Sequence, residues 1–226
     1  MTPFVTVVIP ALFDAEAVSR VLAQLPDVAD LEIVVVDGGP DPQLDMIAAT
    51  HSRTRLVRTT PGRGHQMNIG ALGASGTWVL FLHADSTLPA GWMPAVAAIS
   101  ADVTGGWFRF ALEDAAWQAR LIERLVAWRV RYLGLPYGDQ GFFVRRTHFE
   151  LLGGFREWPL LEDLDFARRL VARGIVFEVP LSLRTSSRRW RRDGWWLRST
   201  LNLLIVVLYF SGVPPTRLAR WYHRMR

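Results

Sequence analysis

A short apolar stretch that ends abruptly in a carboxylate constrains the fold of this chain more than any other feature. Residues 78–82 are five apolar residues in a row, and His83, Ala84 and Asp85 follow directly. An uninterrupted apolar run of this length predicts a strand that is buried on both faces, as in a parallel sheet. Open α/β sheets bind their ligands at the carboxyl ends of such strands, so Asp85 is a candidate for ligand binding.

Two further apolar runs in the first half of the chain share this pattern. Residues 4–9 stop at Pro10, and residues 31–36 end in Asp37 and two glycines. Other strands are expected at residues 55–58, 105–110 and 141–144, and helices at residues 15–25, 41–52, 62–73, 115–133 and 160–173. Strands and helices that alternate at this spacing predict an α/β fold with a mostly parallel, doubly wound sheet. Asp14 is expected to cap the first helix.

The composition indicates one folded core. At 226 residues, half of them apolar, the chain can bury a core of its own. We expect a domain over residues 1–190 and a helical extension over residues 191–226 that packs on it or on a membrane. The chain contains no cysteine, which excludes disulfides and thiolate zinc sites. Residues 1–3 lead into an apolar strand without a positively charged segment, so we expect no signal peptide and a cytoplasmic location.

The positive charge is concentrated at the C-terminal end. Residues 1–178 carry 16 arginines and 20 acidic residues, whereas residues 179–226 carry 10 arginines and Asp193 alone. The chain has no lysine, which excludes chemistry that needs one. Residues 195–210 predict an apolar helix whose longest uninterrupted run falls well short of the roughly 20 residues that span a bilayer. This helix would either pack on protein, including a second copy of the chain, or lie on anionic lipid with Trp195 and Trp196 at the headgroups.

Two polar clusters carry candidate chemistry. Glu162, Asp163 and Asp165 stand at the start of a predicted helix, where they would either favour the helix dipole or supply a catalytic base. The proline and apolar residues before this cluster would direct it toward the interior, which favours the base. Arg63 lies between glycines at another helix start, where a guanidinium and backbone N–H groups can both bind phosphate.

Eight short stretches, taken in order, resemble the motifs of a known family. They are residues 7–10, 33–39, 62–63 with 66–68, 81–85, 136–141, 153–155, 162–163 and 188–190. Together they resemble the family 2 glycosyltransferases, inverting enzymes with the GT-A fold that use nucleotide-diphosphate sugars. The resemblance is closer still to a small bacterial subgroup of radical-SAM/selenodomain-associated transferases. It implies a Rossmann-like sheet with a mixed C-terminal part, followed by C-terminal helices.

The resemblance also implies roles for individual residues. Asp163 would be the catalytic base, supported by Glu162, and Asp85 would bind a Mg²⁺ or Mn²⁺ ion. His83 stands where the family has the first Asp of an Asp-any-Asp motif. The residues that would bind the nucleotide sugar are Pro10, Asp14, Asp37, Gly38, Arg63, Asn68, His83, Ala84, Asp139, Gln140, Arg189 and Trp190. Ser186 replaces a Gln that is typical of processive synthases, which favours a single transfer per encounter.

The expected partners are a UDP- or GDP-sugar, an acceptor that is lipid-linked or otherwise amphipathic, and the inner face of the cell membrane. A sugar-nucleotide nucleotidyltransferase would need lysines and a glycine-rich loop after the first strand, and a dinucleotide-dependent oxidoreductase would need Gly-x-Gly-x-x-Gly. The chain has none of these. A non-catalytic module with the same fold, binding a nucleotide or a membrane surface, stays open, and the nucleotidyltransferase stays the less favoured alternative. Nucleic acid is not expected as a partner, because its phosphates would be repelled by the acidic edge that Asp37, Asp85, Asp139 and Asp163 would form.

Overall fold

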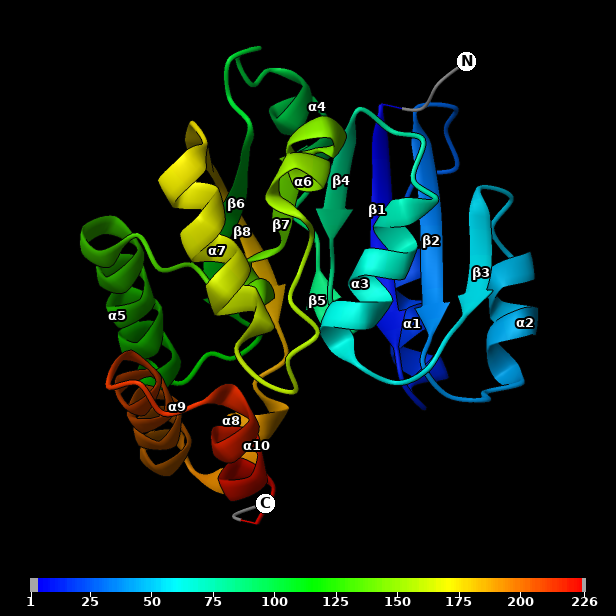
Figure 1. Ribbon diagram of the computed structural model, residues 1–226. Helices are drawn as coiled ribbons and strands as arrows, with labels where there is room; N and C mark the ends of the chain where they lie inside the picture. The colour runs from blue at the N-terminus through cyan, green and yellow to red at the C-terminus, as the bar shows by residue number, and fades with distance from the viewer. Residues whose placement is uncertain (1–3, 225–226) are drawn as a thin grey trace.

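The computed structural model describes the backbone of residues 4–224 and the side chains of residues 4–222. Residues 1–3 and 225–226, at the ends of the two predicted domains, lie outside this range, and so does the expectation of no signal peptide. The described residues form one eight-stranded sheet in the order β3-β2-β1-β4-β7-β6-β8-β5 (Figure 1). The strands are β1 (Val5–Ala11), β2 (Leu31–Asp37), β3 (Thr54–Arg58), β4 (Trp78–Phe81), β5 (Ser86–Thr87), β6 (Gly105–Leu112), β7 (Phe142–Arg145) and β8 (Val176–Thr185).

The first four strands of this order make a parallel unit, and the rest of the sheet is mixed. β1 pairs with β2 and β4, and β2 pairs with β3, all in parallel. β7 runs antiparallel to β4 and β6, whereas β8 is parallel to β6. The short β5 closes the edge antiparallel to β8. The predicted α/β class, with a mostly parallel sheet and a mixed C-terminal part, is therefore confirmed.

Two features of the sheet differ from the prediction. β1 does not stop before Pro10 but continues to Ala11, because β4 pairs with β1 only as far as Val8 and no strand remains on the side that the Pro10 nitrogen faces. A proline in that position costs no hydrogen bond of the ladder. β8 was not predicted, because its register with β6 skips Pro180 and Leu181 and the resulting bulge disturbs the alternation of its side chains.

Helices cover both faces of the sheet (Figure 1). They are α1 (Ala15–Leu22), α2 (Gln43–Ala49), α3 (Arg63–Leu72), α4 (Trp92–Ala97), α5 (Trp117–Leu133), α6 (Arg146–Leu152), α7 (Glu162–Arg173), α8 (Arg188–Asp193), α9 (Trp195–Phe210) and α10 (Pro215–Arg224). Val7 and Ile9 pack with α1, α2 and α4, while Val8, on the opposite face, packs with α3, α6 and α7. The apolar runs are thus strands whose two faces are both buried.

The last three helices lie beyond the carboxyl ends of the parallel strands (Figure 1). α9 packs on the start of α7 and on α10 through a cluster that contains Leu161, Leu164, Ile205, Val206 and Leu218. None of the helices in the described part of the chain is long and apolar enough to cross a membrane. Helices α8 to α10 therefore close the end of the molecule at which the predicted site lies.

Candidate active site

A cleft of about 790 Å³ opens at the carboxyl ends of β1 and β4. Its walls come from the loops after these two strands, the starts of α3 and α7, and helices α8 to α10. The predicted site residues that line it are Pro10, Asp14, Arg63, His83, Ala84, Asp85, Asp139, Glu162, Asp163, Arg189 and Trp190. Residues from both ends of the chain therefore meet in one cavity.

The start of α7 carries two carboxylates into this cleft. Leu161, the residue before the helix, has a φ of +67°, an uncommon conformation for leucine, and is held by burial against α9 and α10. This turn places Glu162 and Asp163 as the first two residues of the helix. The Asp163 carboxylate accepts hydrogen bonds from the backbone N–H groups of Gly138, at 2.9 Å, and Leu164, at 2.8 Å.

Gly138 allows this contact because it has no side chain. A Cβ at that position would lie 3.1 Å from Nε2 of His83 and 3.2 Å from Oδ2 of Asp163. Either distance is tighter than ordinary van der Waals contact. The glycine therefore lets the short 3₁₀ turn η1 (Gly138–Gln140) approach the start of α7 and donate to its carboxylate.

Arg63 is shared between the two carboxylates. Its Nε donates to Glu162, and its Nη2 lies 4.0 Å from Asp163. Burial would raise the pKa of Asp163, but the Arg63 guanidinium and the N–H of Gly138 outweigh it, so this pKa lies below its usual value. Burial raises the pKa of Glu162 even though Arg63 opposes the shift. Asp163 is therefore ionised in neutral solution and available to accept a proton.

His83 and Asp85 line the cleft from the loop after β4. Burial, reinforced by the charge of Arg63, lowers the pKa of His83 to about 4, so its ring is neutral at neutral pH. The Asp85 carboxylate lines the cleft and forms no side-chain hydrogen bond or ion pair with any residue that the structure describes. Within residues 4–222, no group of three or more His, Cys, Asp or Glu side chains is placed to hold a metal ion.

Asp139, the residue after Gly138, lines the same cleft. Burial raises its pKa to about 6; Arg129 opposes the shift, and the nearby carboxylates of Asp163 and Asp85 add to it. Its Oδ1 atom is buried and has no hydrogen-bond partner among the residues whose side chains the structure describes. The side chain is therefore held in a position that costs stability while the carboxylate is ionised and unpaired.

Four of the predicted donor-binding residues do not line the cleft but support its walls. Asp37 accepts hydrogen bonds from the N–H groups of Gly39, at 2.9 Å, and Asp41, at 3.3 Å, and so holds the turn after β2. Gly38 lies in that turn, where a Cβ would meet the Gln66 side chain at 2.8 Å.

Asn68 and Gln140 play similar parts on the other side. Asn68 exchanges two hydrogen bonds of 2.8 Å with the backbone of Phe155, which ties α3 to the loop before α7. Gln140 donates to the carbonyl of Phe108 at 3.1 Å and accepts from the N–H of Tyr137 at 3.3 Å. Asp14 lines the cleft, but its side chain makes no hydrogen bond to the helix it was expected to cap.

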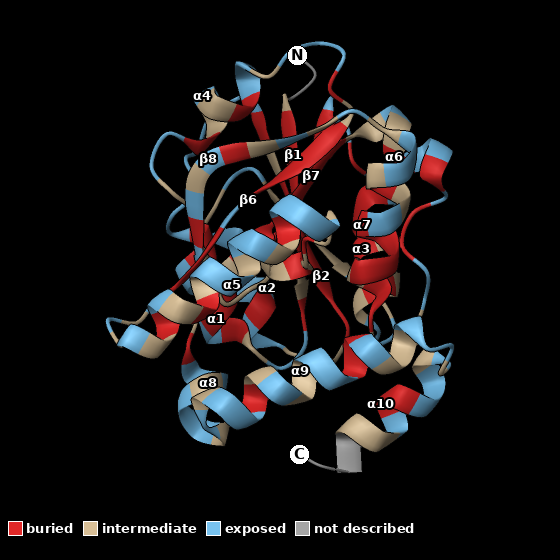
Figure 2. Cartoon of the chain, turned by 90° about the vertical axis from the view of Figure 1, so that its left-hand side faces the viewer, coloured by how far each residue is buried: buried red, intermediate tan, exposed pale blue. Residues whose placement is uncertain are grey.

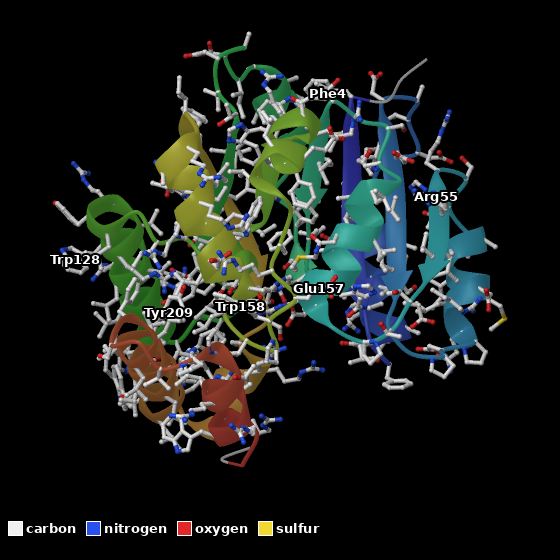
Figure 3. All side chains as sticks on the ribbon, viewed as in Figure 1. Phe4, Arg55, Trp128, Glu157, Trp158 and Tyr209 are labelled. Atoms are coloured by element: carbon white, nitrogen blue, oxygen red, sulfur yellow. The ribbon has the colours of Figure 1, made fainter. Side chains whose placement is uncertain are left out.

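Sequence reasoning missed several residues of the cleft. Gln66, 3% exposed, donates to the carbonyls of Ala11, at 2.7 Å, and Val36, at 2.9 Å, and so joins the ends of β1 and β2. Its place among the matched motif residues was the available signal. Trp158, which Figure 3 labels between the lower end of α7 and the C-terminal helices, also lines the cleft, as do Arg198 and Asn202 of α9. No local pattern marks these three, because only long-range packing brings them there.

The sequence of the chain is similar to those of known proteins. The sequence pattern described as glycosyl transferase family 2 matches residues 6–150. Uncharacterized glycosyltransferases of Mycobacterium bovis and Mycobacterium tuberculosis are 34% identical to the chain over 131 residues, which cover 56% of this chain and 59% of each relative. The chain thus matches less than two thirds of the length of these curated relatives.

Solved structures share the fold. A mannosyltransferase from Pyrobaculum calidifontis, in complex with GDP-Man and Mn²⁺, has a TM-score of 0.66 at 19% identity, covering 95% of this chain and 67% of that chain. Residues 1–349 of S. aureus TarS, in complex with UDP-GlcNAc, have a TM-score of 0.63 at 15% identity, covering 81% of this chain and 58% of that chain. Together with the sheet order, this likeness confirms the predicted GT-A fold.

Proposed function

Because this chain belongs to glycosyl transferase family 2, we propose that its cleft transfers a sugar from a nucleotide-diphosphate sugar to the hydroxyl of an acceptor, one sugar per encounter and with inversion at the anomeric carbon. The observation that carries the proposal is the ionised Asp163 carboxylate in the cleft wall, fixed by Gly138 and Arg63. Inverting transfer needs one base on the acceptor side, in line with the departing diphosphate. The motif pattern favours the radical-SAM/selenodomain-associated subgroup as part of the same proposal.

Each charged residue then has a distinct task. Asp163 takes the proton from the acceptor hydroxyl as it attacks. Glu162 binds Arg63 and holds its guanidinium beside Asp163. The backbone N–H groups at the start of α3, together with Arg63 and Arg189, bind the diphosphate and stabilise its departure.

The cleft also fits a divalent cation. Asp85 offers a carboxylate that no described residue engages, and hard oxygen atoms are the ligands that Mg²⁺ and Mn²⁺ prefer. With no cluster of three such side chains among residues 4–222, the ion would rest on Asp85 and on the phosphates of the donor. Such an ion would neutralise charge on the leaving diphosphate. The GDP-Man and Mn²⁺ of the Pyrobaculum mannosyltransferase and the UDP-GlcNAc of TarS support a metal-assisted UDP- or GDP-sugar enzyme.

We further propose that the enzyme works at the inner face of the cell membrane, on an acceptor that is lipid-linked or otherwise amphipathic. Figure 2, in which α5 and α9 face the viewer, shows exposed residues along both helices. Large apolar side chains are among them: Trp117, Leu125, Trp128, Tyr132 and Leu133 on α5, and Trp196, Leu197, Leu203, Val207 and Phe210 on α9. The ring centroids of Trp117 and Trp196 lie 5.8 Å apart, so the two helices share one apolar surface. Its arginine-rich surroundings favour anionic lipid over a second copy of the same basic face.

A donor screen tests the proposed chemistry. UDP-, GDP-, CDP- and TDP-sugars, each with Mn²⁺ and with chelator, should raise the melting temperature for one nucleotide in the presence of metal. For that donor, Asp85→Ala should weaken binding only when metal is present. No shift with any donor would favour a non-catalytic module with this fold.

Matched variants of α7 test the base. Asp163→Asn should keep the donor-induced shift and lose release of nucleoside diphosphate to water, the slow reaction that needs no acceptor. Asp165→Asn is the control, since this carboxylate lies in the same helical turn but pairs with Arg169, at 2.8 Å, instead of lining the cleft. Substantial residual turnover in Asp163→Asn would disprove the assignment. A double variant tests the membrane contact. Trp117→Ser combined with Trp196→Ser should reduce sedimentation of the protein with anionic liposomes. Wild-type protein that does not sediment with such liposomes would refute the membrane contact.

A further inference from the structure

One half of the cleft is not used by the residues assigned to the donor. Arg189 follows three residues after Ser186, whose N–H donates to the carbonyl of Asp85 at 3.2 Å, so it lies at the end near Asp85. Arg63 lies there too, because its Nη2 is 4.0 Å from Asp163, which faces His83 across Gly138. The other end is lined by the loop before α7 and by α9 and α10. Its apolar residues are Trp158, Leu160, Leu161, Ile205, Val206 and Tyr222. Since Leu160 and Leu161 lead directly into Glu162 and Asp163, this apolar wall adjoins the proposed base.

A buried arginine lies in this apolar half. Arg198 is 6% exposed and lines the cleft, and Asn202, one helical turn further along α9, lines it too. Trp158, which Figure 3 labels beside the C-terminal helices, belongs to the apolar lining of this half, and its ring centroid lies 6.2 Å from that of Tyr209 near the end of α9. The polar pair therefore stands on the inner face of a helix whose outer face carries the exposed apolar side chains.

The charge of Arg198 is incompletely balanced within the protein. Its Nη1 lies 3.5 Å from Oδ2 of Asp193, and its Nη2 donates to the hydroxyl of Tyr222. Asp193 is bound more closely by Arg192, at 2.6 Å. Among residues 4–222 the Nε of Arg198, which is buried, has no hydrogen-bond partner, and Asp193 is its one carboxylate partner. A buried cation that shares this carboxylate and retains an unused donor is costly unless a ligand completes it.

We propose that Arg198, with Asn202, binds an anionic group of the acceptor, a phosphate or carboxylate, while the apolar wall of Trp158, Leu160 and Ile205 contacts its carbon chain. The inference rests on the proposed function and names the acceptor class, an anionic amphiphile. Arg188, which also lines the cleft and forms no ion pair within residues 4–222, adds to the positive potential that attracts such a group.

Binding of three small probes tests this site. Geranyl phosphate, geraniol and glycerol 3-phosphate are titrated into the full chain, with the fluorescence of the cleft tryptophans or calorimetry as the readout. Geranyl phosphate should bind at least tenfold more tightly than geraniol, a difference of about 1.4 kcal/mol. Arg198→Met should reduce that ratio to about twofold or less. Equal binding of geranyl phosphate and geraniol by the wild type would overturn the proposal.

Arg192→Met is the matched control, because Arg192 binds the same Asp193 but is exposed and does not line the cleft. It should keep the tenfold ratio, and a loss equal to that of Arg198→Met would overturn a direct role for Arg198. Should Arg198→Met fail to fold, Asn202→Leu takes its place, with a reduced preference for geranyl phosphate expected and an unchanged one counting against the site.

Two further measurements distinguish the source of the anion and separate the anion site from the proposed sugar transfer. Glycerol 3-phosphate that binds as well as geranyl phosphate would overturn the contact between the apolar wall and a carbon chain, and much weaker binding supports an amphiphilic acceptor. The donor-induced melting shift is measured on the same variants. An anion preference that depends on Arg198 in a protein that binds no donor would sink the proposed transfer and leave the anion site standing. Donor binding by a protein whose anion preference does not depend on Arg198 would disprove the anion site alone.

Discussion

Asp139→Asn should stabilise the ligand-free protein at neutral pH, although it alters a residue of the candidate active site. The carboxylate is held among buried groups, its Oδ1 has no hydrogen-bond partner within residues 4–222, and burial raises its pKa to about 6. An unfolded chain has an Asp pKa of about 3.9. The native state therefore binds this proton more tightly than the unfolded state does.

The sign and size of the effect follow from that difference. The contribution of Asp139 to stability is fully present below about pH 4 and is lost as the pH rises through about 6. Two units of pKa, at about 1.36 kcal/mol each, correspond to a cost of about 2–3 kcal/mol at pH 8. Asn is uncharged at every pH and has the shape of the acid, so the variant should escape this cost.

Urea denaturation between pH 4 and pH 8 measures the cost in stability of the ionised Asp139. The free energy of unfolding of Asp139→Asn minus that of the wild type should rise from near zero at pH 4 to about 2–3 kcal/mol at pH 8. Asp114→Asn is the control, since hydrogen bonding to Arg191, joined by Ala116 and Ser187, holds the pKa of Asp114 well below its usual range. That variant should be less stable than the wild type by an amount that stays flat from pH 4 to pH 8. A flat difference for Asp139→Asn, or one of opposite slope, would refute the reasoning.

Three further substitutions test the walls of the cleft. Asn68→Ala removes two hydrogen bonds to the backbone of Phe155 and should lower the free energy of unfolding by about 2 kcal/mol, which urea denaturation would show; an unchanged midpoint would contradict the tie between α3 and the loop before α7. Gly138→Ala places a methyl group 3.2 Å from the Asp163 carboxylate and should slow turnover about 100-fold with little loss of melting temperature. Glu162→Gln removes a like charge from beside Asp163 and leaves Arg63 to pair with it, so the pKa of Asp163 should fall and the acid limb of the pH–rate profile should move to lower pH. A limb that moves upward would mean that Arg63 does not pair with Asp163.

The strands were predictable from sequence where burial on two faces makes a run uniformly apolar. β1, β2 and β4 have side chains buried on both sides, so each is visible as a continuous apolar segment. β8 carries Pro180, and its alternation of exposed and buried residues is broken at the bulge. It pairs with β6, about 70 positions earlier in the chain. Its place in the sheet is set by that distant partner, which no local pattern reports.

The candidate site divides in the same way. Arg63, Asp85 and Asp163 each stand at the end of a strand or the start of a helix, where local chemistry predicts a ligand-facing residue, and the structure places all three in one cleft. Asp37 and Asn68 have equally suggestive positions, yet their side chains are consumed by backbone hydrogen bonds. Whether a polar residue faces a ligand or its own backbone depends on distances across the fold, which sequence spacing does not contain.

The two ends of the cleft therefore come from different parts of the chain. The stretch that matches the family, residues 6–150, contains Pro10, Arg63 and Asp85, and these residues form the end assigned to the donor. Asp163, Arg189 and Arg198 come later in the chain and reach the cleft because α9 and α10 pack on the start of α7. An acceptor must meet Asp163 from the side that these helices close. Residues of α9 and α10 are therefore expected to determine the acceptor, and substitutions in these two helices should change which acceptor is used while leaving donor binding intact.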